Sequence, residues 1–285
     1  MNHRQIGRLG RAFLLTAGLA GCTSAGMITG SIPEAEETPS ATSPANIASL
    51  SEVVQRNPSD PQAYNTRGSV LGQANRNEEA LADFNKAISL DPNYTQAYAN
   101  RALIYRQTNK LDLALADYSK ALSLDANYTA AYLGRGIVYR LKGQAMPAFE
   151  DFNKAIAVRP DSAQAYYNRG LLYQGQRQYQ FAIDDFTTAV GLSPQLAEPL
   201  IARGLTRMAM NDHKAAASDL DEAVTAEPKN LQAWTSRGLA YEKLGDKERA
   251  AGSYAQALNI NRNYETAKTG FARVGGKTGQ AYQAF

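Results

Sequence analysis

Bulky and small apolar residues recur along this chain at a constant interval of 34 residues, with helical spacing inside each interval. Counting from Pro61 to Tyr264 gives six units without an insertion or a deletion. In the second half of each unit, two alanines seven residues apart flank a bulky residue that follows the first alanine by four. The alanines are Ala80, Ala87, Ala114, Ala121, Ala148, Ala155, Ala182, Ala189, Ala216, Ala223, Ala250 and Ala257, and the bulky residues are Phe84, Tyr118, Phe152, Phe186, Leu220 and Tyr254. Because residues i, i+4 and i+7 share one face of a helix, this stripe predicts the second helix of every unit.

The first half of each unit carries a bulky residue that is followed four positions later by a small one. The bulky residues are Tyr64, Tyr98, Tyr132, Tyr166, Leu200 and Trp234, and the small residues are Gly68, Ala102, Gly136, Gly170, Gly204 and Gly238. Such a small side chain lets two helix backbones approach closely, which outweighs the roughly 1 kcal/mol that a glycine costs inside a helix. Prolines such as Pro92 and Pro160 then end one unit before the next begins. The pattern predicts six helix-turn-helix units.

This spacing of bulky, small, alanine and proline positions resembles that of tetratricopeptide repeat (TPR) proteins. The resemblance implies an all-α fold, a right-handed superhelical α-solenoid whose six repeats occupy residues 61–264. The flanking residues continue the pattern and predict a capping helix within residues 45–60 and a second one over residues 265–274. Residues 275–285 are rich in glycine, and we expect them to form a flexible tail.

The N-terminal residues 1–21 have the composition of a secretory signal peptide. Three arginines without an acid precede an apolar run that is too short to span a bilayer. The segment from Leu19 to Cys22 resembles the lipobox of bacterial lipoproteins, in which the cysteine is lipid-modified and becomes the first residue of the mature chain. We therefore predict lipidation of Cys22, the only cysteine in the chain, and a flexible tether over residues 22–44. Two alternatives are an ordinary secretion signal and an uncleaved segment on a cytoplasmic scaffold.

Charge and residue inventory argue against several classes of function. Removing residues 1–21 lowers the 30 basic residues to 27, which equals the 27 acidic ones, so the mature chain lacks the basic field of a nucleic-acid binder. The remaining histidine, His213, is expected to be solvated in the turn between the two helices of the fifth unit. We therefore predict no catalytic residue, no metal site, no cofactor and no small-molecule substrate, although groove carboxylates keep an enzyme as a less favoured alternative.

One arginine and one aspartate recur in almost every unit. The arginines are Arg67, Arg101, Arg135, Arg169, Arg203 and Arg237, and the aspartates are Asp83, Asp117, Asp151, Asp185 and Asp219, with Ser253 in the last unit. We predict that each arginine pairs with an aspartate of the neighbouring helix, so that the pairs form a structural ladder along the solenoid. The lysines Lys86, Lys120 and Lys154 lie three residues after their aspartates and are competing local partners.

The family resemblance implies that partner segments bind in a concave groove lined by the first helices. The residues at its second, fifth, sixth, ninth and twelfth positions include Asn65, Asn100, Arg106, Leu133, Ile137, Arg140, Gln164, Tyr167, Asn168, Leu171, Ile201 and Met208. A clamp for a terminal carboxylate, one known use of such grooves, is disfavoured because Ala130, Gly134, Glu198 and Ala202 stand where cations are needed. The strip suits a segment with apolar side chains and available backbone carbonyls.

The fifth unit departs from the others because Leu200, Arg207 and Leu220 replace aromatic residues. Fewer aromatic contacts predict weaker packing, so we expect a flexible point or, with Met208 and Met210, part of a binding patch.

Together these features predict a lipid-anchored TPR scaffold of the bacterial cell envelope that binds segments of other envelope proteins. Resemblance to lipoproteins of this kind suggests two forms. One form brings together proteases or peptidoglycan-modifying enzymes, and the other assists secretin assembly as pilotins of pilus systems do. Thr23, directly after Cys22, favours the periplasmic face of the outer membrane over the inner membrane.

Overall fold

The computed structural model describes residues 41–276, and every regular element among them is an α-helix. The predicted signal peptide, the predicted lipidation site Cys22, most of the predicted tether and residues 277–285 lie outside the described residues. Described residues 61–264 form six units of 34 residues, each made of two helices. The fold is therefore an all-α solenoid of helix-turn-helix repeats, as predicted.

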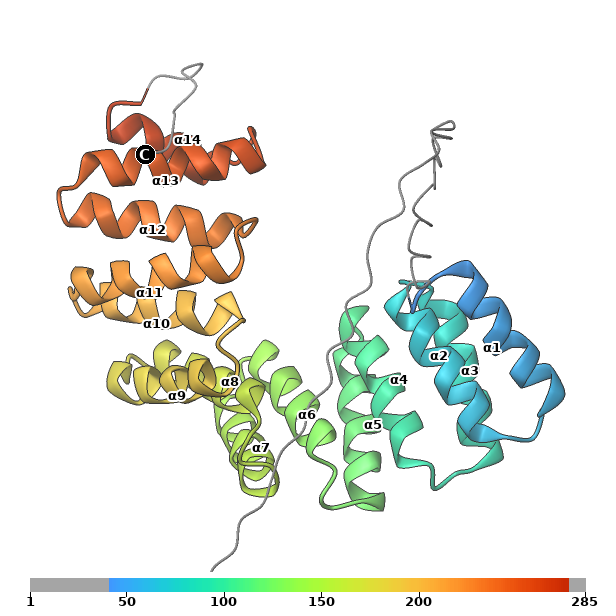
Figure 1. The fold of residues 1–285 in the computed structure, drawn as a ribbon. Coiled ribbons are helices and arrows are strands. Elements are labelled where there is room, and N and C mark those ends of the chain that lie inside the picture. The colour runs from blue at the N-terminus through green and yellow to red at the C-terminus, as the bar shows by residue number, and fades with distance from the viewer. Residues whose placement is uncertain (1–40, 277–285) are drawn as a thin grey trace, which may run out of the picture. The chain divides into compact units, whose positions relative to one another are not determined.

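Fourteen helices follow one another through residues 41–276 (Figure 1). They are α1 (Pro44–Arg56), α2 (Pro61–Gln73), α3 (Asn77–Leu90), α4 (Thr95–Gln107), α5 (Leu111–Leu124), α6 (Thr129–Leu141), α7 (Ala145–Val158), α8 (Ala163–Gly175), α9 (Tyr179–Leu192), α10 (Ala197–Ala209), α11 (His213–Ala226), α12 (Leu231–Lys243), α13 (Lys247–Ile260) and α14 (Glu265–Arg273). Units 1 to 6 correspond to the pairs from α2 and α3 through α12 and α13. The flanking helices α1 and α14 lie where the sequence predicts caps, although α1 begins one residue earlier than expected, at Pro44.

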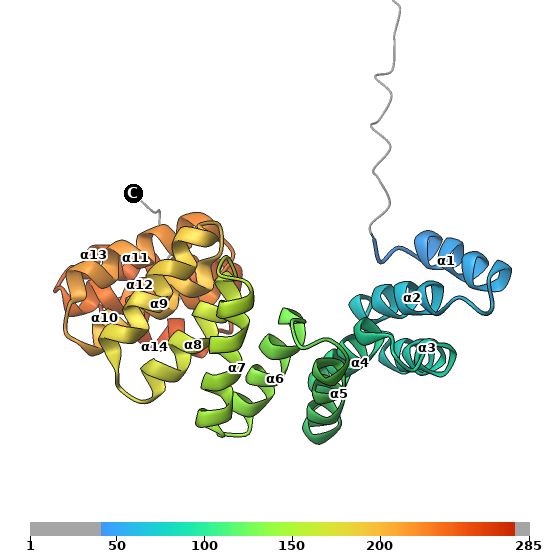
Figure 2. The ribbon, with the colours of Figure 1, turned by 90° about the horizontal axis from the view of Figure 1, so that it is seen from below.

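Each helix packs against the next one in the chain, as Figure 1 and Figure 2 show. The first helices of consecutive units also contact one another, in the series α2, α4, α6, α8, α10, α12 and α14. These helices form a continuous surface, which we call the inner face. A partner segment that lies along this face meets side chains from several units at once.

The repeat alanines and bulky residues form the core between the helices. All twelve alanines are 0% exposed, and the six bulky residues at the centre of each stripe are at most 3% exposed. Gly136 lies so close to the next helix that a Cβ there would stand 2.7 Å from the Phe152 ring. The predicted close approach of the helices is therefore confirmed. Replacing a ring such as Phe152 by alanine costs roughly 3–5 kcal/mol because it leaves a cavity.

The turn between the two helices of each unit uses one residue with a left-handed backbone. This residue recurs every 34 positions, at Asn75, Asn109, Gly143, Arg177, Asn211 and Gly245, with φ between 57° and 80°. Glycine and asparagine tolerate this conformation well, and an arginine does not. Arg177 therefore marks a strained turn in the fourth unit.

Candidate functional site

The predicted ladder arginines and aspartates come together in five of the six units. Arg67 is typical, because its Nε donates to Asp83 Oδ2 at 2.8 Å and its Nη2 donates to Oδ1 at 2.7 Å. The same two-pronged contact joins Arg101 to Asp117, Arg135 to Asp151 and Arg169 to Asp185, and Arg203 contacts one oxygen of Asp219 through two nitrogens. The hydrogen bonding of Arg67 to the Asp83 carboxylate is the main cause that raises the pKa of Arg67.

Each ladder arginine also reaches the preceding unit or the cap. The second partner lies sixteen residues before the arginine, and these partners are Ser51, Asn85, Ser119, Asn153, Thr187 and Asp221. In the sixth unit the carboxylate and the hydroxyl exchange sides, since Arg237 contacts Asp221 at 2.6 Å and Ser253 at 2.7 Å. The predicted pairing with an aspartate of the same unit therefore ends before Arg237. These arginines connect consecutive second helices, which accounts for their regular recurrence.

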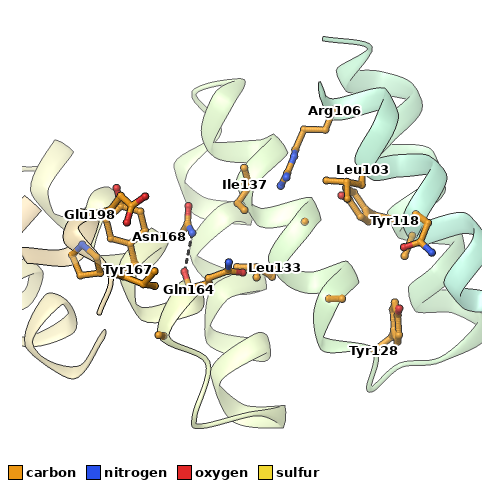
Figure 3. Close-up of a pocket in the computed structure, with 17 residues that line it drawn as sticks. Leu103, Arg106, Tyr118, Tyr128, Leu133, Ile137, Gln164, Tyr167, Asn168 and Glu198 are labelled. Atoms are coloured by element: carbon orange, nitrogen blue, oxygen red, sulfur yellow. Dashed lines mark hydrogen bonds between the residues drawn. The ribbon is translucent and has the colours of Figure 1, made fainter. Parts of the chain in front are cut away.

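The inner face is hollowed over units 2 to 4, where a cavity of about 530 Å³ lies between α4, α6, α8 and the start of α10. Figure 3 shows Arg106 and Tyr118 toward one end, Leu133 and Ile137 in the middle and Glu198 at the other end. Seven predicted groove residues line the cavity: Asn100, Arg106, Leu133, Ile137, Gln164, Tyr167 and Asn168. The cavity therefore has an apolar centre with polar groups around it, which suits a peptide segment better than a small polar molecule.

Three of the predicted asparagines form hydrogen bonds with neighbouring residues of the chain. Asn65 is only 9% exposed and donates to the Tyr94 hydroxyl, while Asn100 donates to Asn65 and to Ser69. Asn168 is also buried, and its amide donates to the Gln164 carbonyl on the same helix at 2.8 Å. These amides therefore stabilise the wall of the inner face.

Other predicted groove residues lie outside the cavity. Ile201 is 3% exposed and belongs to the core that continues into the sixth unit, and Met208 packs against that core. The prediction that Ile201 is a groove residue is wrong because α11 and α12 cover this position. Leu171 packs beside the buried Phe186. Arg140 stands on α6 next to the cavity without lining it.

The sequence did not mark Tyr118 as a surface residue, yet it lines the cavity. Gly134 makes this possible, because a Cβ at that position would overlap the end of the Tyr118 ring. Burial raises the pKa of Tyr118 to about 12, so the hydroxyl stays protonated and remains a hydrogen-bond donor at neutral pH. The signal in the sequence was a tyrosine paired with a glycine sixteen residues later.

Two arginines carry the positive charge of this region. No carboxylate within residues 41–276 lies within ion-pair distance of Arg106 or Arg140. The Nε of Arg140 is buried and has no hydrogen-bond partner among these residues. Burial, opposed in part by Tyr167, lowers the pKa of Arg140, and the nearby charge of Arg106 lowers it further. The positive end of the cavity is thus open to an anionic group.

The fifth unit has buried aliphatic residues and an additional ion pair where other units have aromatic residues. Its first helix α10 buries Leu200 and Ile201 in the largest core cluster of the described chain. Arg207, which replaces an aromatic residue, donates to Asp219 Oδ1 at 2.6 Å and to the Ala215 carbonyl. Aliphatic residues and an ion pair thus stand in place of the missing rings, and the flexibility of this unit stays a prediction.

The described residues contain neither a group of metal ligands nor a helix that could cross a membrane. Within residues 41–276, no three histidine, cysteine, aspartate or glutamate side chains are grouped as metal ligands. His213 is the first residue of α11 and is partly buried, so its predicted place in a solvated turn is wrong. None of the helices between residues 41 and 276 has the length and apolar content that crossing a membrane requires.

Sequence profiles of known families match most of the repeat region. Profiles described as "Tetratricopeptide repeat" match residues 61–94, 84–116, 163–196 and 201–267, and one described as "TPR repeat" matches residues 102–143 and 138–177. The chain belongs to the tetratricopeptide repeat family. TPR proteins bind peptide or protein partners and are generally scaffolds without catalytic activity. No curated protein matches the sequence.

Several solved structures share this TPR fold. A chain of the APC/C hetero-tetramer Cut9-Hcn1 has a TM-score of 0.72 at 19% identity, covering 82% of this chain and 46% of that one. This TPR chain thus spans less than half of that protein. Pseudomonas aeruginosa pilF has a TM-score of 0.67 at 18% identity, covering 77% and 99%. YrrB, described as a TPR protein with an unusual peptide-binding site, has a TM-score of 0.52 at 26% identity, covering 65% and 96%.

Proposed function

We propose that this TPR protein is an adaptor that holds an extended segment of a partner protein in the cavity over units 2 to 4. The observation that carries the proposal is the cavity itself, with Leu133 and Ile137 at its centre and polar groups toward both ends. Side chains from α4, α6, α8 and α10 surround it, so one segment meets several units. YrrB, which shares the fold, is described as having a peptide-binding site, and this is consistent with such a role.

We further propose that the adaptor is a lipoprotein of the bacterial cell envelope, attached through Cys22 and facing the periplasm from the outer membrane. The support is the charged and apolar pattern of residues 1–21 followed by the lipobox-like segment that ends at Cys22. A tether of about 22 residues after Cys22 would let the repeats work away from the lipid surface, at very roughly 25 Å as a coil. The partners are then segments of other envelope proteins.

A second form of this function is assistance in the assembly of a pilus system. Two solved structures with the same fold support this second form. They are pilF and PilW, and PilW is described as a type IV pilus biogenesis factor. The alignments cover 99% and 97% of those two chains, so the repeat arrays are similar in extent. The identity of 18% in both cases supports the fold, and the pilus role is a proposal.

Photo-crosslinking in cells tests the binding surface. A photoreactive phenylalanine analogue at Tyr167 is expected to capture a partner, because this side chain lines the cavity. The matched control carries the same analogue at Thr188, which is exposed on the second helix of the same unit. Capture of the same proteins from both positions, or from Thr188 alone, would contradict binding at the inner face.

Lipid attachment has its own test. Cells that express the protein with an alkyne-labelled fatty acid are expected to yield a labelled, membrane-bound chain that begins at Cys22. The Cys22→Ser variant is expected to lose the label and to leave the membrane fraction. Equal labelling of the two proteins, or an intact N-terminus that still begins at Met1, would favour the cytoplasmic alternative.

A further inference from the structure

Hydrogen-bond donors without acceptors lie at the positive end of the cavity and, for Arg140, directly beside it. The Nε of Arg140 is buried and unpartnered, and neither Arg140 nor Arg106 has a carboxylate partner within residues 41–276. The Tyr118 hydroxyl, at the same end, has no hydrogen-bond partner among these residues. A buried donor without an acceptor costs about 1–3 kcal/mol, and more when it is charged. A bound acceptor would remove this cost.

The sixth unit contains a related arrangement in which the carboxylate belongs to the chain, although its guanidinium comes from Arg273, at the position where the third unit has Ile137. Tyr254 occupies the same position as Tyr118, and each of them lies against a glycine sixteen residues later, Gly270 and Gly134. The Tyr254 hydroxyl donates to Glu242 Oε2 at 2.9 Å. Arg273 donates to both oxygens of Glu242, at 2.9 Å each. A carboxylate between a tyrosine hydroxyl and a guanidinium is therefore already built once in this protein.

The corresponding place in the second unit has no carboxylate. Arg106 stands at the twelfth position of its unit, where the sixth unit has Glu242, and Arg140 stands at the twelfth position of the third unit. The hydroxyl and two cations are thus present near one another, and the anion is missing. In the other units the central bulky residue has no hydroxyl, and the facing residue is Asn100, Asn168, Ala202 or Ser236. The pairing of tyrosine with glycine therefore occurs only at these two places among the six units.

We propose that Tyr118 and Arg106, with the positive charge of Arg140 beside the cavity, form a subsite for the side-chain carboxylate of one aspartate or glutamate in the bound partner segment. The inference rests on the proposed function, because the segment that supplies the carboxylate lies in the inner-face cavity. The residues that flank this acid are apolar, since Leu133 and Ile137 form the neighbouring centre of the cavity. Charge-assisted hydrogen bonds to a guanidinium are about twice as strong as neutral ones, so this acid would fix the register of the segment.

Two features favour a side chain over other anions. The inner face continues past the subsite on both sides, toward α2 and toward α8, so a chain can run through rather than end there. Glu198 lies toward the other end of the cavity and repels a segment with acids along its whole length (Figure 3). A partner segment fits both features if it has one acidic residue near α4 and α6 and apolar residues along the part that runs toward α8.

Selection of peptides from a random displayed library against the full chain tests the subsite. Selected sequences are then synthesised as acetylated and amidated pairs that differ only by Glu→Gln or Asp→Asn at the acidic position. The wild-type protein is expected to bind the acidic peptide about 10-fold or more tightly than its amide partner, as the loss of a charge-assisted pair implies. This preference is expected to fall to about 1 in the Arg106→Gln/Arg140→Gln protein.

Two further variants separate the subsite from general effects. Tyr118→Phe keeps the ring and removes the hydroxyl, and units 1, 3 and 4 have phenylalanine at this position. This variant is expected to bind the acidic peptide more weakly than the wild type does and to bind the amide peptide equally well. Arg159→Gln removes an exposed arginine after α7 and is the matched charge control, for which the acidic preference is retained. Circular dichroism of each variant verifies that the helices are intact.

The outcomes distinguish the subsite from the adaptor function. Selected peptides that bind equally as acid and amide, or that bind only with a free terminal carboxylate, overturn the subsite. If their binding is nevertheless lost in Leu133→Asp, the adaptor function stands. Failure to select any peptide, or peptides whose binding is unaffected by Leu133→Asp, overturns the inner-face function itself.

Discussion

The inner faces of units 2 to 4 and of the fifth unit are built from the same repeat, yet one is open and the other is closed. At the fifth position of their units, Leu133 and Tyr167 are half-buried and line the cavity, whereas Ile201 is 3% exposed. The backbone pattern is the same in both regions. The difference shows that a repeat position becomes a surface or a core position according to the helices packed against it.

The fifth unit also pairs its arginines internally, through Asp219 Oδ1, while Asp219 Oδ2 is buried without a hydrogen-bond partner among residues 41–276. Arg203 and Arg207 share Asp219, which is 1% exposed, and no guanidinium of this pair is left for a ligand. In units 2 and 3 the corresponding surface leaves Arg106 and Arg140 without an acid among residues 41–276. The closed region stabilises the array, and the open region keeps unmet donors for a partner.

The largest expected effect is the loss of Asp219. Asp219→Ala would leave two guanidinium groups without their acid, and we expect it to lower the free energy of unfolding by about 3–5 kcal/mol. Asp151→Ala removes the acid of one arginine, Arg135, whose side chain is 22% exposed and can be hydrated, so about 2 kcal/mol is expected. Urea denaturation of the full chain measures both. A larger loss from Asp151→Ala would contradict the special role of the fifth unit.

The second effect depends on pH and concerns Tyr118 of the open region. Burial raises the pKa of Tyr118 to about 12 from an unfolded value near 10, so the unfolded chain releases this proton first. The associated stability, up to about 2–3 kcal/mol, is complete below pH 10 and is lost as the pH rises through 12. Unfolding measured at about pH 9 and about pH 11.5 is expected to show a smaller alkaline loss in Tyr118→Phe than in wild type. Equal losses would show that this hydroxyl is not buried. The fifth unit has Leu220 at this position, and leucine does not titrate. This position of the fifth unit therefore adds no pH dependence to the free energy of unfolding.

The third prediction concerns the glycines that face the central residues. Gly134→Ala forces the Tyr118 ring to move and is expected to cost about 1–3 kcal/mol. In the fifth unit, Gly204→Ala meets Leu220 at 3.0 Å, a flexible aliphatic group, and is expected to cost less. Thermal unfolding compares the two variants, and Tyr118→Phe in the Gly134→Ala background is expected to restore part of the loss. Equal costs with no restoration would refute the fit between Gly134 and the hydroxyl.

The smallest effect lies in the turns of the two regions. Arg177 in the fourth unit has φ of 59°, and Asn211 at the same place in the fifth unit has φ of 64°. Arg177→Gly is expected to raise the free energy of unfolding by about 0.5–1 kcal/mol, since glycine adopts this backbone without strain. Asn211→Gly is expected to change it by only a few tenths, because asparagine already tolerates the conformation. Greater stabilisation by Asn211→Gly would contradict the assignment of strain to Arg177.

The sequence alone predicted the repeat register, the two helices of each unit, the caps and five ladder pairs. These features follow from short separations and from a pattern that every unit repeats, so each copy reports the same local structure. Arg237 shows the limit of this reasoning. Its acid comes from the preceding unit, which the pattern of the other five units does not indicate.

What only the tertiary structure decided is which positions of that regular pattern are open. Ile201 packs in a core that continues into the next unit, Tyr118 reaches the cavity because Gly134 belongs to the following helix, and the Nε of Arg140 is buried without a hydrogen-bond partner among residues 41–276. Each of these facts depends on residues from two or more units meeting in space. The sequence therefore determined the scaffold through local spacing, and contacts between units determined where a partner can bind.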